Sequence, residues 1–281
     1  MGVDAGVKIG IQGEVGSYSA EAASAMVPGA ELLSFTSFAD VYQDLQSARI
    51  DAAVLPFENT LVGSIAEQYD LLASHAAEIV QEWVIRIEHQ VIGLPGAELS
   101  QVREVFSHPV ALEQCRRFFA ANEQIIARPY YDTAGSVAHI MTVRDAGVAA
   151  IASRTAAVHY GGEILAADVQ DDSTNCTRFW LLRRSGEGMQ VPDANKVTVL
   201  LELPHEPAAL SKALADFGMR GFNLTRIESR PVRGKPFHYH FFLDFECATL
   251  AEADVAIAAL RTRGSRVRVL GRYRAAQNPN A

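Results

Sequence analysis

The sequence predicts an α/β fold made of two unequal parts, and three observations support this prediction. Across the first two-thirds of the chain, short apolar runs alternate with helix-like segments, which is typical of α/β architecture with mainly parallel sheets. At 183–195 this pattern gives way to a polar stretch that contains Gly and Pro and is typical of a linker. Beyond it, strands and helices follow the order βαββαβ, which is the ferredoxin-like split unit.

The first part contains apolar runs of strand length that are bounded by turn-forming residues. We expect strands at 7–12, 32–35, 52–57, 84–87, 91–94, 105–107, 148–151 and 178–182. We expect helices at 19–26, 38–46 and 64–75, and further helices that begin at Pro109 and near Asp132. Because ligands of such sheets bind at the carboxyl ends of strands, polar residues at those positions are the candidates for a site.

The second part is expected to form one small domain. Its strands are expected at 196–203, 223–232, 238–246 and 266–273, and its helices at 208–218 and 251–264. In the first of these helices, Leu210, Leu214 and Phe217 recur at helical spacing. The predicted divisions of the chain are a first domain at 1–185, a linker at 186–195, a C-terminal domain at 196–274 and a tail at 275–281.

The composition is that of a globular protein. A chain of 281 residues, 49% of them hydrophobic, is long enough to bury a sizeable core without disulfides or metals. The net charge of −8 argues against a broad nucleic-acid-binding surface. No apolar run reaches the roughly 18 residues that a membrane-spanning helix needs, and the start does not resemble a signal peptide. We therefore expect a cytoplasmic protein that binds neither nucleic acid nor membranes.

Cysteine and histidine spacing predicts no disulfide framework and no metal site. Cys115, Cys176 and Cys247 lie far apart and include no CxxC pair, which favours reduced thiols. His238 and His240 share one face of a predicted strand, but no third ligand lies nearby in the sequence. The chain also contains neither the GxSxG motif of a nucleophile elbow nor the HExxH motif of zinc proteases.

The first candidate for chemistry is the Gly- and Ser-rich segment 13–23, which joins a strand to a helix. Its backbone N–H groups, with the hydroxyls of Ser17 and Ser19, are suited to hold a carboxylate or phosphate at the helix N-terminus. An ordinary N-cap and tight turn explain the same residues. The segment contains neither GxGxxG nor GxxxxGK[ST], so it does not support a nucleotide-binding fingerprint.

A second candidate lies at the end of the strand predicted at 52–57. Glu58 and Asn59 follow this apolar strand directly, where an α/β enzyme carries its polar working groups. The alternative is a polar strand end, with Thr60 or Ser64 capping the next helix. Sequence alone leaves both interpretations open.

Two further segments combine polar residues with a helix start. Ser107 and His108 precede Pro109, a residue favoured in the first turn of a helix, and a lone histidine there is more often structural than catalytic. Asp132 and Thr133 precede an apolar helix, so either residue is explained as a cap. Neither segment by itself indicates a site.

The densest polar cluster leads into the strand predicted at 178–182. Asn175, Thr177 and Arg178 are candidates because an arginine pairs bidentately with a carboxylate and a threonine hydroxyl both donates and accepts hydrogen bonds. The alternative is that Arg178 pairs with Asp171 or Asp172 across the preceding loop.

In chain order, these segments together resemble the prephenate dehydratase family. The segments are GEVGSYSAEAA (13–23), LPFENTLVGS (55–64), SHPVALEQC (107–115), DTAGS (132–136), NCTRF (175–179) and NLTRIESRP (223–231). Thr-Arg-Phe at 177–179 and Glu-Ser-Arg-Pro at 228–231 are the most specific signatures. The resemblance implies a catalytic region similar to a type-2 periplasmic binding protein, with a cleft between two lobes, followed by an ACT domain.

The resemblance also implies an activity: conversion of prephenate to phenylpyruvate with loss of CO2 and water, in phenylalanine biosynthesis. It implies no metal and no organic cofactor. No chorismate mutase region precedes the dehydratase segment, so a monofunctional form is expected. In this family the ACT domain binds phenylalanine at a subunit interface and inhibits the enzyme, which implies feedback regulation and a homodimer or homotetramer.

The resemblance assigns roles to residues. Thr177 is expected to hydrogen-bond the leaving hydroxyl, Arg178 and the amides near Ser17 to clamp carboxylates in a cationic cleft, and Glu58 to supply a proton if burial raises its pKa. Asn59 completes the catalytic set. The expected substrate-binding residues are Ser17, Tyr18, Ser19, Thr60, Ser107, His108, Thr133, Ala134, Asn175 and Phe179. The expected allosteric residues are Ala208, Ala209, Leu210, Asn223, Leu224, Glu228, Ser229 and Arg230.

The sequence departs from the family pattern at positions that bear on the substrate and the effector. Asp132 stands where many bacterial members have serine, and this segment and Gln-Asp-Asp at 170–172 look more like plant arogenate dehydratases. Arogenate carries an ammonium group that an extra carboxylate favours, so it is the second candidate substrate. Ala208 replaces a usual glycine, which predicts weakened or altered phenylalanine inhibition. A third hypothesis, a non-catalytic amino-acid sensor, is disfavoured by the intact 177–179 triplet.

Overall fold

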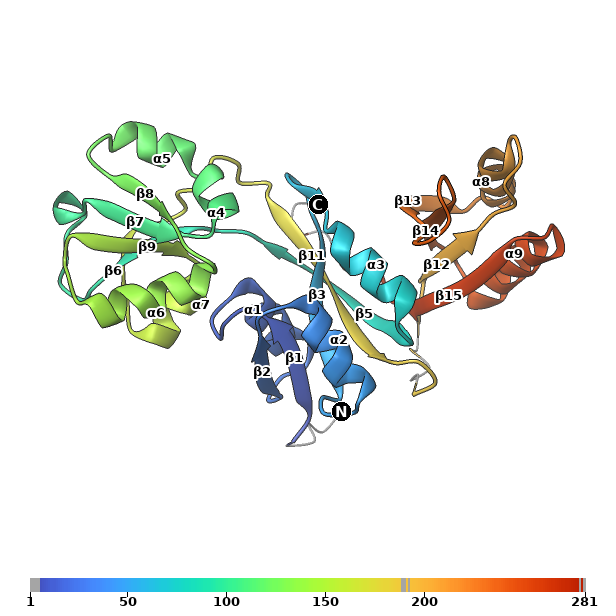
Figure 1. Cartoon of the computed structure of the whole chain (residues 1–281), viewed down its shortest axis with the longest axis horizontal. Coiled ribbons are helices and arrows are strands. Elements are labelled where there is room, and N and C mark those ends of the chain that lie inside the picture. Colours follow the sequence, from blue (N-terminus) through green and yellow to red (C-terminus); the bar gives the residue numbers. More distant parts are fainter. Residues whose placement is uncertain (1–5, 188–190, 192, 278, 280–281) are drawn as a thin grey trace.

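The computed structural model describes residues 6–187, 191, 193–277 and 279, and these residues form two sheets. A ten-stranded sheet has the order β13-β14-β12-β15-β5-β11-β3-β1-β2, with β4 paired to β3. A five-stranded sheet has the order β10-β6-β9-β7-β8. Figure 1 shows the five-stranded sheet and its helices at one end of the molecule and β12–β15 at the other.

The first lobe contains the N-terminal part of the ten-stranded sheet. Its elements are β1 (Lys8–Gln12), α1 (Tyr18–Met26), β2 (Glu31–Phe35), α2 (Phe38–Gln46), β3 (Ala52–Asn59), β4 (Gly63–Ser64), α3 (Ala66–Ser74), β5 (Ala77–Arg86) and β11 (Cys176–Arg184). β1 runs parallel to β2 and β3, as predicted. β11 is antiparallel to both β3 and β5, because the chain re-enters this lobe from the second one. The prediction of mainly parallel strands is therefore wrong for the strand that carries the 177–179 triplet.

The second lobe is built on the five-stranded sheet. Its elements are β6 (Gln90–Gly93), the 3-10 helix η1 (Leu99–Gln101), β7 (Glu104–Ser107), α4 (Pro109–Glu113), α5 (Arg116–Ala121), β8 (Ile126–Pro129), α6 (Thr133–Val143), β9 (Val148–Ala152), α7 (Arg154–Tyr160) and β10 (Glu163–Ala166). The chain crosses between the lobes twice, after β5 and before β11. This arrangement confirms the predicted two-lobed region.

The C-terminal domain has the predicted βαββαβ order. Its elements are β12 (Lys196–Glu202), α8 (Ala209–Met219), β13 (Asn223–Pro231), β14 (Tyr239–Glu246), α9 (Leu250–Thr262) and β15 (Arg266–Tyr273). The sheet order β13-β14-β12-β15 is the ferredoxin-like one, with the second strand at the edge. Of the predicted linker and tail, residues 188–190, 192, 278, 280 and 281 lie outside the described residues.

The C-terminal domain and the first lobe share one sheet and one core. β15 pairs in parallel with β5 through Gly271 and Ile79, and a Cβ atom on Gly271 would overlap the Ile79 carbonyl group. A single cluster of buried side chains contains Trp180 and Tyr69 of the lobe together with Phe242 of the C-terminal domain. The two parts are therefore packed as one continuous structure at this junction.

Charged groups are buried inside this junction. Arg226 makes a bidentate pair with Asp244, with both nitrogen–oxygen distances at 2.8 Å, and its guanidinium lies 4.7 Å from the ring centres of both Tyr69 and Trp180. Lys196 Nζ lies 2.9 Å from both carboxylate oxygens of Glu82. Buried charges are tolerated only when paired in this way, so these pairs constrain how the domains meet.

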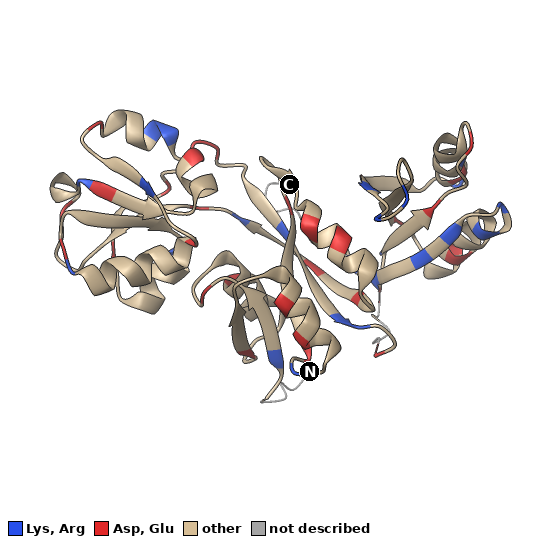
Figure 2. Ribbon diagram, in the orientation of Figure 1, with Lys and Arg blue, Asp and Glu red and all other residues tan. Residues whose placement is uncertain are grey.

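Helix α3 of the first lobe is also held by arginines of the C-terminal domain. Arg230 of β13 pairs bidentately with Asp70, at 2.9 Å for both contacts. Arg268 of β15 donates to the carbonyl groups of Leu72, Ala73 and His75, which close the C-terminal end of the helix. Figure 2 shows the corresponding basic bands on β15 and acidic bands on α3. A cation at a helix C-terminus is favourable because it faces the negative end of the helix dipole.

Replacing Asp244 with Asn is expected to destabilise the protein by about 3–5 kcal/mol, because Arg226 would be left as a buried, uncompensated charge. Burial opposes ionisation of Asp244, but Arg226, Lys196 and the Thr198 hydroxyl together lower its pKa below the ordinary 3.8. The carboxylate therefore stabilises the fold above pH 3.8, and this contribution is lost as the pH falls through the lower folded pKa.

Urea unfolding near neutral pH and below pH 4 measures this difference. The matched control is Asp254→Asn, since Asp254 pairs with Arg272 at the surface and is expected to contribute at most about 1 kcal/mol. Equal destabilisation by the two variants at neutral pH would contradict the assignment.

Candidate functional site

A cleft of about 350 Å³ lies between the two lobes. The first lobe contributes the end of β1, the start of α1, and parts of β3 and β11, and the second lobe contributes the starts of α4 and α6. The lining residues are Gln12, Ser17, Tyr18, Ser19, Pro56, Asn59, Val62, Ile65, Ile87, His89, His108, Val110, Ala111, Gln114, Asp132, Thr133, Thr177 and Phe179. Mixed apolar walls with a few polar groups are typical of a small-molecule site.

Thr177 is held in the cleft by Asn59 of the neighbouring strand. The two residues face each other in the β3–β11 register, and Asn59 Nδ2 donates to Thr177 Oγ1 at 2.9 Å. Asn59 is itself oriented, because its Oδ1 accepts from the backbone N–H groups of Leu61 and Val62 at 3.0 Å. Since the Thr177 oxygen accepts this bond, its own proton is available for donation to a molecule in the cleft.

Arg178 lies on the opposite face of β11, so its predicted role in clamping substrate is wrong. Successive side chains of a strand point to opposite faces, and Thr177 and Phe179 occupy the cleft face. The Arg178 guanidinium instead lies 3.4 Å from Glu58, 3.6 Å from Asp244 and 3.7 Å from Glu82. The alternative pairing with the loop carboxylates at 171 and 172 is also absent among the described contacts, because both carboxylates accept hydrogen bonds from other groups.

Glu58 is excluded from the cleft for the same reason. It precedes Asn59 on β3, so its carboxylate points away from Thr177 and toward Arg178. Glu58, Thr60 and Arg178 line a separate cavity behind the strands, together with Lys196 of the C-terminal domain. The expectation that Glu58 supplies a proton to a ligand in the cleft is therefore wrong.

The predicted binding residues divide into three groups. Those that line the cleft are Ser17, Tyr18, Ser19, His108, Thr133 and Phe179. Those that lie beneath it are Ser107, which donates to the Ile151 carbonyl at 2.6 Å, Ala134, which is part of the core, and Asn175, which accepts from Asn59. Thr60 lines the separate cavity behind the strands and ties β3 to β11 by accepting from the Cys176 N–H. The second and third groups support the site without reaching it.

Helix caps explain part of the sequence pattern without excluding a role in the cleft. The side chains of Ser17, His108 and Asp132 cap α1, α4 and α6, as the alternative interpretation predicted, and all three line the cleft. The starts of these helices therefore converge on one space. The predicted cap of α3 by Thr60 or Ser64 is not formed, since α3 begins after Ile65 without a side-chain cap.

The electrostatics of the cleft differ from the expectation of a cationic site. Among the described lining residues there is no lysine and no arginine. Favourable sites for an anion are left to the N–H groups at the start of α1, because the Asp132 carboxylate already caps the start of α6. Asp132 brings a carboxylate into the cleft; burial raises its pKa, the nearby Glu14 raises it further, and the Gly135 N–H partly offsets the shift.

Sequence reasoning missed several lining residues. Gln12 ends β1, His89 lies between β5 and β6, and Gln114 follows α4. Gln114 lies inside the candidate segment 107–115, but an isolated amide residue carries no sequence signal of a binding role. A histidine between two apolar strands was the one available signal for His89. The apolar wall formed by Val62, Ile65 and Ile87 has no sequence signature of its own.

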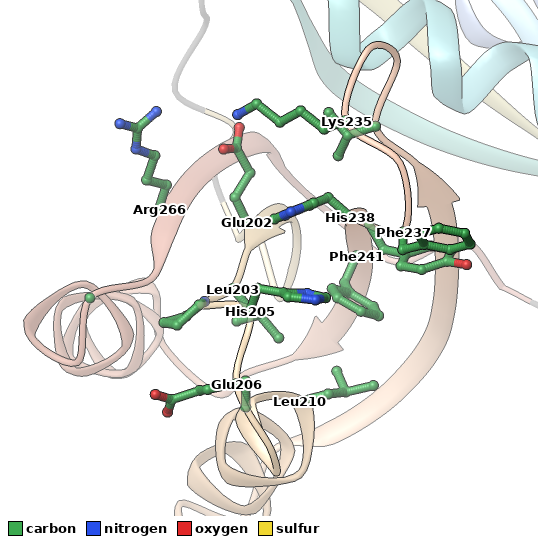
Figure 3. A pocket seen from close by; sticks show the side chains of 15 residues that line it. Glu202, Leu203, His205, Glu206, Leu210, Lys235, Phe237, His238, Phe241 and Arg266 are labelled. Carbon is green, nitrogen blue, oxygen red and sulfur yellow. The ribbon is translucent and has the colours of Figure 1, made fainter.

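The predicted allosteric residues all lie on the C-terminal domain, which contains a second cavity of about 520 Å³. Some of these residues lie at the cavity, and others lie away from it. Ala209 and Leu210 line this cavity, which Figure 3 shows with the stacked rings of His205 and His238. Ala208 precedes α8 with φ at +64°, which explains why glycine is suited to this position.

The remaining allosteric residues lie along β13. Glu228, Ser229 and Arg230 pair with the start of β14 near the cavity, whereas Asn223 and Leu224 pair with its far end. Within one copy of the domain, the predicted allosteric residues therefore form two groups: one near the cavity and one at the opposite end of β13.

In the described part of the chain, the histidines form no metal-binding cluster and no helix is suited to span a membrane. Among the described residues, no three His, Cys, Asp or Glu side chains are grouped to hold a metal ion. His238 stacks on His205, and His240 lies 3.5 Å from Glu202. No helix in the described part of the chain is both long and apolar enough to span a bilayer.

Comparison with known proteins agrees with this geometry. The family model for prephenate dehydratase matches residues 9–187. A curated relative, arogenate dehydratase/prephenate dehydratase 1 of Arabidopsis thaliana, is 37% identical over 97% of this chain and 73% of its own length. The structure of an Arthrobacter aurescens prephenate dehydratase in complex with L-Phe is 30% identical, with a TM-score of 0.85 and coverage of 96% of this chain and 90% of that chain.

A further solved structure, that of the quorum quenching acylase GqqA, is 31% identical with a TM-score of 0.85, and the match covers 95% of this chain and 98% of that chain. The family match covers the lobes that form the cleft, and the relatives extend through the C-terminal domain. The cleft, the 177–179 strand and these matches together show that the chain is a lyase of the prephenate dehydratase family.

Proposed function

We propose that the protein catalyses the decarboxylating dehydration of prephenate to phenylpyruvate, as a step in phenylalanine biosynthesis. The observation that carries this proposal is the Thr177 hydroxyl, which Asn59 holds in the interlobe cleft with its proton available. The ring carboxylate leaves as CO2, its bonding electrons move through the ring, and the ring hydroxyl leaves with a proton as water. Formation of the aromatic ring supplies the driving force.

The chain's own residues orient the substrate in this scheme. Val62, Ile65 and Phe179 form an apolar surface for the ring, and removal of water there strengthens hydrogen bonds to the polar substituents. The Thr177 hydroxyl donates a hydrogen bond to the departing hydroxyl. A threonine is too weakly acidic to release its proton alone, so Thr177 positions the leaving group while the proton arrives from solvent or through a relay.

Arogenate is the second candidate substrate, and Asp132 is the observation that favours it. The Asp132 carboxylate lines the cleft, where the ammonium group of arogenate would pair with it and the keto group of prephenate would not. The name of the Arabidopsis relative carries both activities. Discrimination between the two compounds then depends on one charged contact in the cleft.

We further propose that the C-terminal domain is an ACT domain that responds to phenylalanine. The Arthrobacter relative was solved in complex with L-Phe, and the βαββαβ domain of this chain has the expected topology. β13 forms the open edge of the ten-stranded sheet. An open strand edge is able to pair with a second copy of the chain, and on this ground we propose a homodimer or a dimer of dimers. A cytoplasmic location stays a prediction.

Replacing Thr177 with Val is expected to lower kcat by roughly 10²–10³-fold, the usual cost of removing one preorganised hydrogen-bond donor from an active site. Valine keeps the shape, and the amide of Asn59 keeps its bonds to Asn175 and Cys176, so stability should change little. Phenylpyruvate formation from prephenate measures the loss, and Thr177→Ser, which retains the hydroxyl, is the matched control. Full activity of the valine variant would refute the role of Thr177.

Replacing Asp132 with Asn is expected to lower the arogenate-to-prephenate ratio of kcat/KM by about tenfold, equivalent to roughly 1.4 kcal/mol. Asparagine preserves the cap of α6, so the change isolates the charge. Paired assays with the two substrates measure the ratio. An unchanged ratio would mean that Asp132 does not meet the ammonium group, and absence of turnover with either compound in the unmodified protein would overturn the proposed function itself.

Replacing Ala208 with Gly is expected to stabilise the protein by about 1 kcal/mol. The Cβ atom of alanine is strained at the positive φ of this position, whereas glycine has no Cβ atom. Thermal unfolding measures this effect, with Ala209→Gly in the first turn of α8 as a destabilising control. If the methyl group also obstructs the effector, Ala208→Gly strengthens inhibition by phenylalanine in the same preparation. A lower Tm for Ala208→Gly would contradict the strained geometry.

A further inference from the structure

Strand β3 contains a β-bulge at Phe57, next to the hydrogen bond that holds Thr177. The register of β3 against β11 pairs Asn59 with Thr177 but Pro56 with Phe179. The two residues of β3 between Pro56 and Asn59 therefore oppose a single residue of β11, and the one without a partner is Phe57. Bulges are common beside active sites, where the extra residue re-aims the side chains that follow it.

The bulge decides which side chains of β3 face the cleft. Pro56 and Asn59 line the cleft, whereas the two residues between them, Phe57 and Glu58, both lie on the opposite face. In a regular strand, every second side chain shares a face. A strand that continued evenly from Pro56 would therefore turn Glu58 into the cleft. It would also place Glu58, instead of Asn59, opposite Thr177.

The residue opposite Thr177 determines what its hydroxyl can do. The NH2 group of Asn59 donates to Thr177 Oγ1, which leaves the threonine proton for a molecule in the cleft. An ionised carboxylate only accepts hydrogen bonds, so Glu58 at this place would bind that proton itself. Its negative charge would also repel a substrate that carries carboxylates. The extra residue in β3 thus keeps the Thr177 hydroxyl available as a donor.

Two hydrogen bonds hold the backbone of β3 at the bulge. The Phe57 carbonyl accepts from the Ile65 N–H at 2.9 Å and from the Tyr69 hydroxyl of α3 at 3.3 Å. Burial raises the pKa of Tyr69 to about 12, so the phenol keeps the proton that it donates. The rings of Phe57 and Tyr69 also meet edge to face, with their centroids 5.5 Å apart. The other contact of the Tyr69 ring is the Arg226 guanidinium of the C-terminal domain, at 4.7 Å.

We propose that Tyr69 is a positioning residue for the reaction, because its bond to Phe57 fixes the bulge in β3. The bulge in turn places the amide of Asn59, and not the carboxylate of Glu58, beside Thr177. Tyr69 is fully buried and is not among the described residues that line the cleft, so its hydroxyl acts only through β3. This inference deepens the proposed function and rests on it for the reaction that Thr177 serves.

The placement of Asn59 is testable without substrate. In the full-length protein labelled with ¹⁵N, the side-chain NH2 group of Asn59 gives a pair of proton resonances, which Asn59→Asp identifies by their disappearance. Because this group donates to Thr177 and Asn175, we expect its protons to exchange slowly with solvent. In Tyr69→Phe we expect the exchange to be about tenfold faster. Equal exchange rates in the two proteins overturn the proposal, whether or not the protein turns over prephenate.

Tyr42→Phe is the matched control for Tyr69→Phe. Tyr42 is equally buried in the same core cluster, but its hydroxyl has no hydrogen-bond partner among the described residues. We expect Tyr69→Phe to lower kcat about tenfold with KM within about twofold, and Tyr42→Phe to leave both unchanged. Unchanged kcat in Tyr69→Phe overturns the proposal. An equal loss of kcat in both variants also overturns it, because the effect then comes from a general loosening of the core.

Two substitutions in β3 test the bulge itself. Asn59→Asp puts a carboxylate beside Thr177, and we expect it to lower kcat about 100-fold. Glu58→Gln removes a charge on the opposite face, so we expect kcat to stay within about threefold, although the ion pair with Arg178 at 3.4 Å is lost. The reverse order of these effects places Glu58 in the cleft and overturns the proposal. Absence of turnover in the unmodified protein refutes the proposed function instead, and the exchange rates of the Asn59 amide then decide this inference.

Discussion

The structure depends on one buried pair of charges, Arg226 with Asp244. The pair lies where the C-terminal domain meets the first lobe, and its guanidinium covers the rings of Tyr69 and Trp180. Two opposite charges that are buried away from water are tolerated only when they lie close together and when their other donor and acceptor atoms also form hydrogen bonds. Asp244 satisfies this condition through Thr198 as well as Arg226. The domains therefore meet in one arrangement, and the core that they share is closed around it.

This arrangement gives the two faces of β11 different roles. Thr177 and Phe179 face the cleft, while Arg178 and Trp180 face the junction with the C-terminal domain. The strand that positions the Thr177 hydroxyl is thus also the strand whose opposite face contacts Asp244 through Arg178. A movement of the C-terminal domain that repacks the junction would act directly on the backbone that carries Thr177. The two faces of β11 therefore connect the C-terminal domain to the cleft, and the proposed phenylalanine response could act on Thr177 through this single strand.

The elements themselves were largely predictable from the sequence. The helix at 38–46 was placed to the residue, because Ser37 and an amphipathic pattern with buried Val41, Tyr42 and Leu45 mark it clearly. The βαββαβ order followed from alternating strands and Gly-ended helices. The direction of β11 was not predictable, because nothing local in an apolar strand shows which neighbour it will join. That choice is made by a return from the second lobe across many residues.

The cleft, like the fold, has features that the local sequence determines and others that depend on the tertiary structure. The sequence by itself determined the composition of the cleft rim: Ser17, His108 and Asp132 follow strands and begin helices, and their positions at strand ends bring them to one edge. Only the tertiary structure decided that Thr177 reaches the cleft and Arg178 does not, since strand alternation separates neighbours but does not say which face becomes the site. It also brought His89 and Gln114 together, because a hydrogen bond between side chains distant in sequence leaves no local pattern.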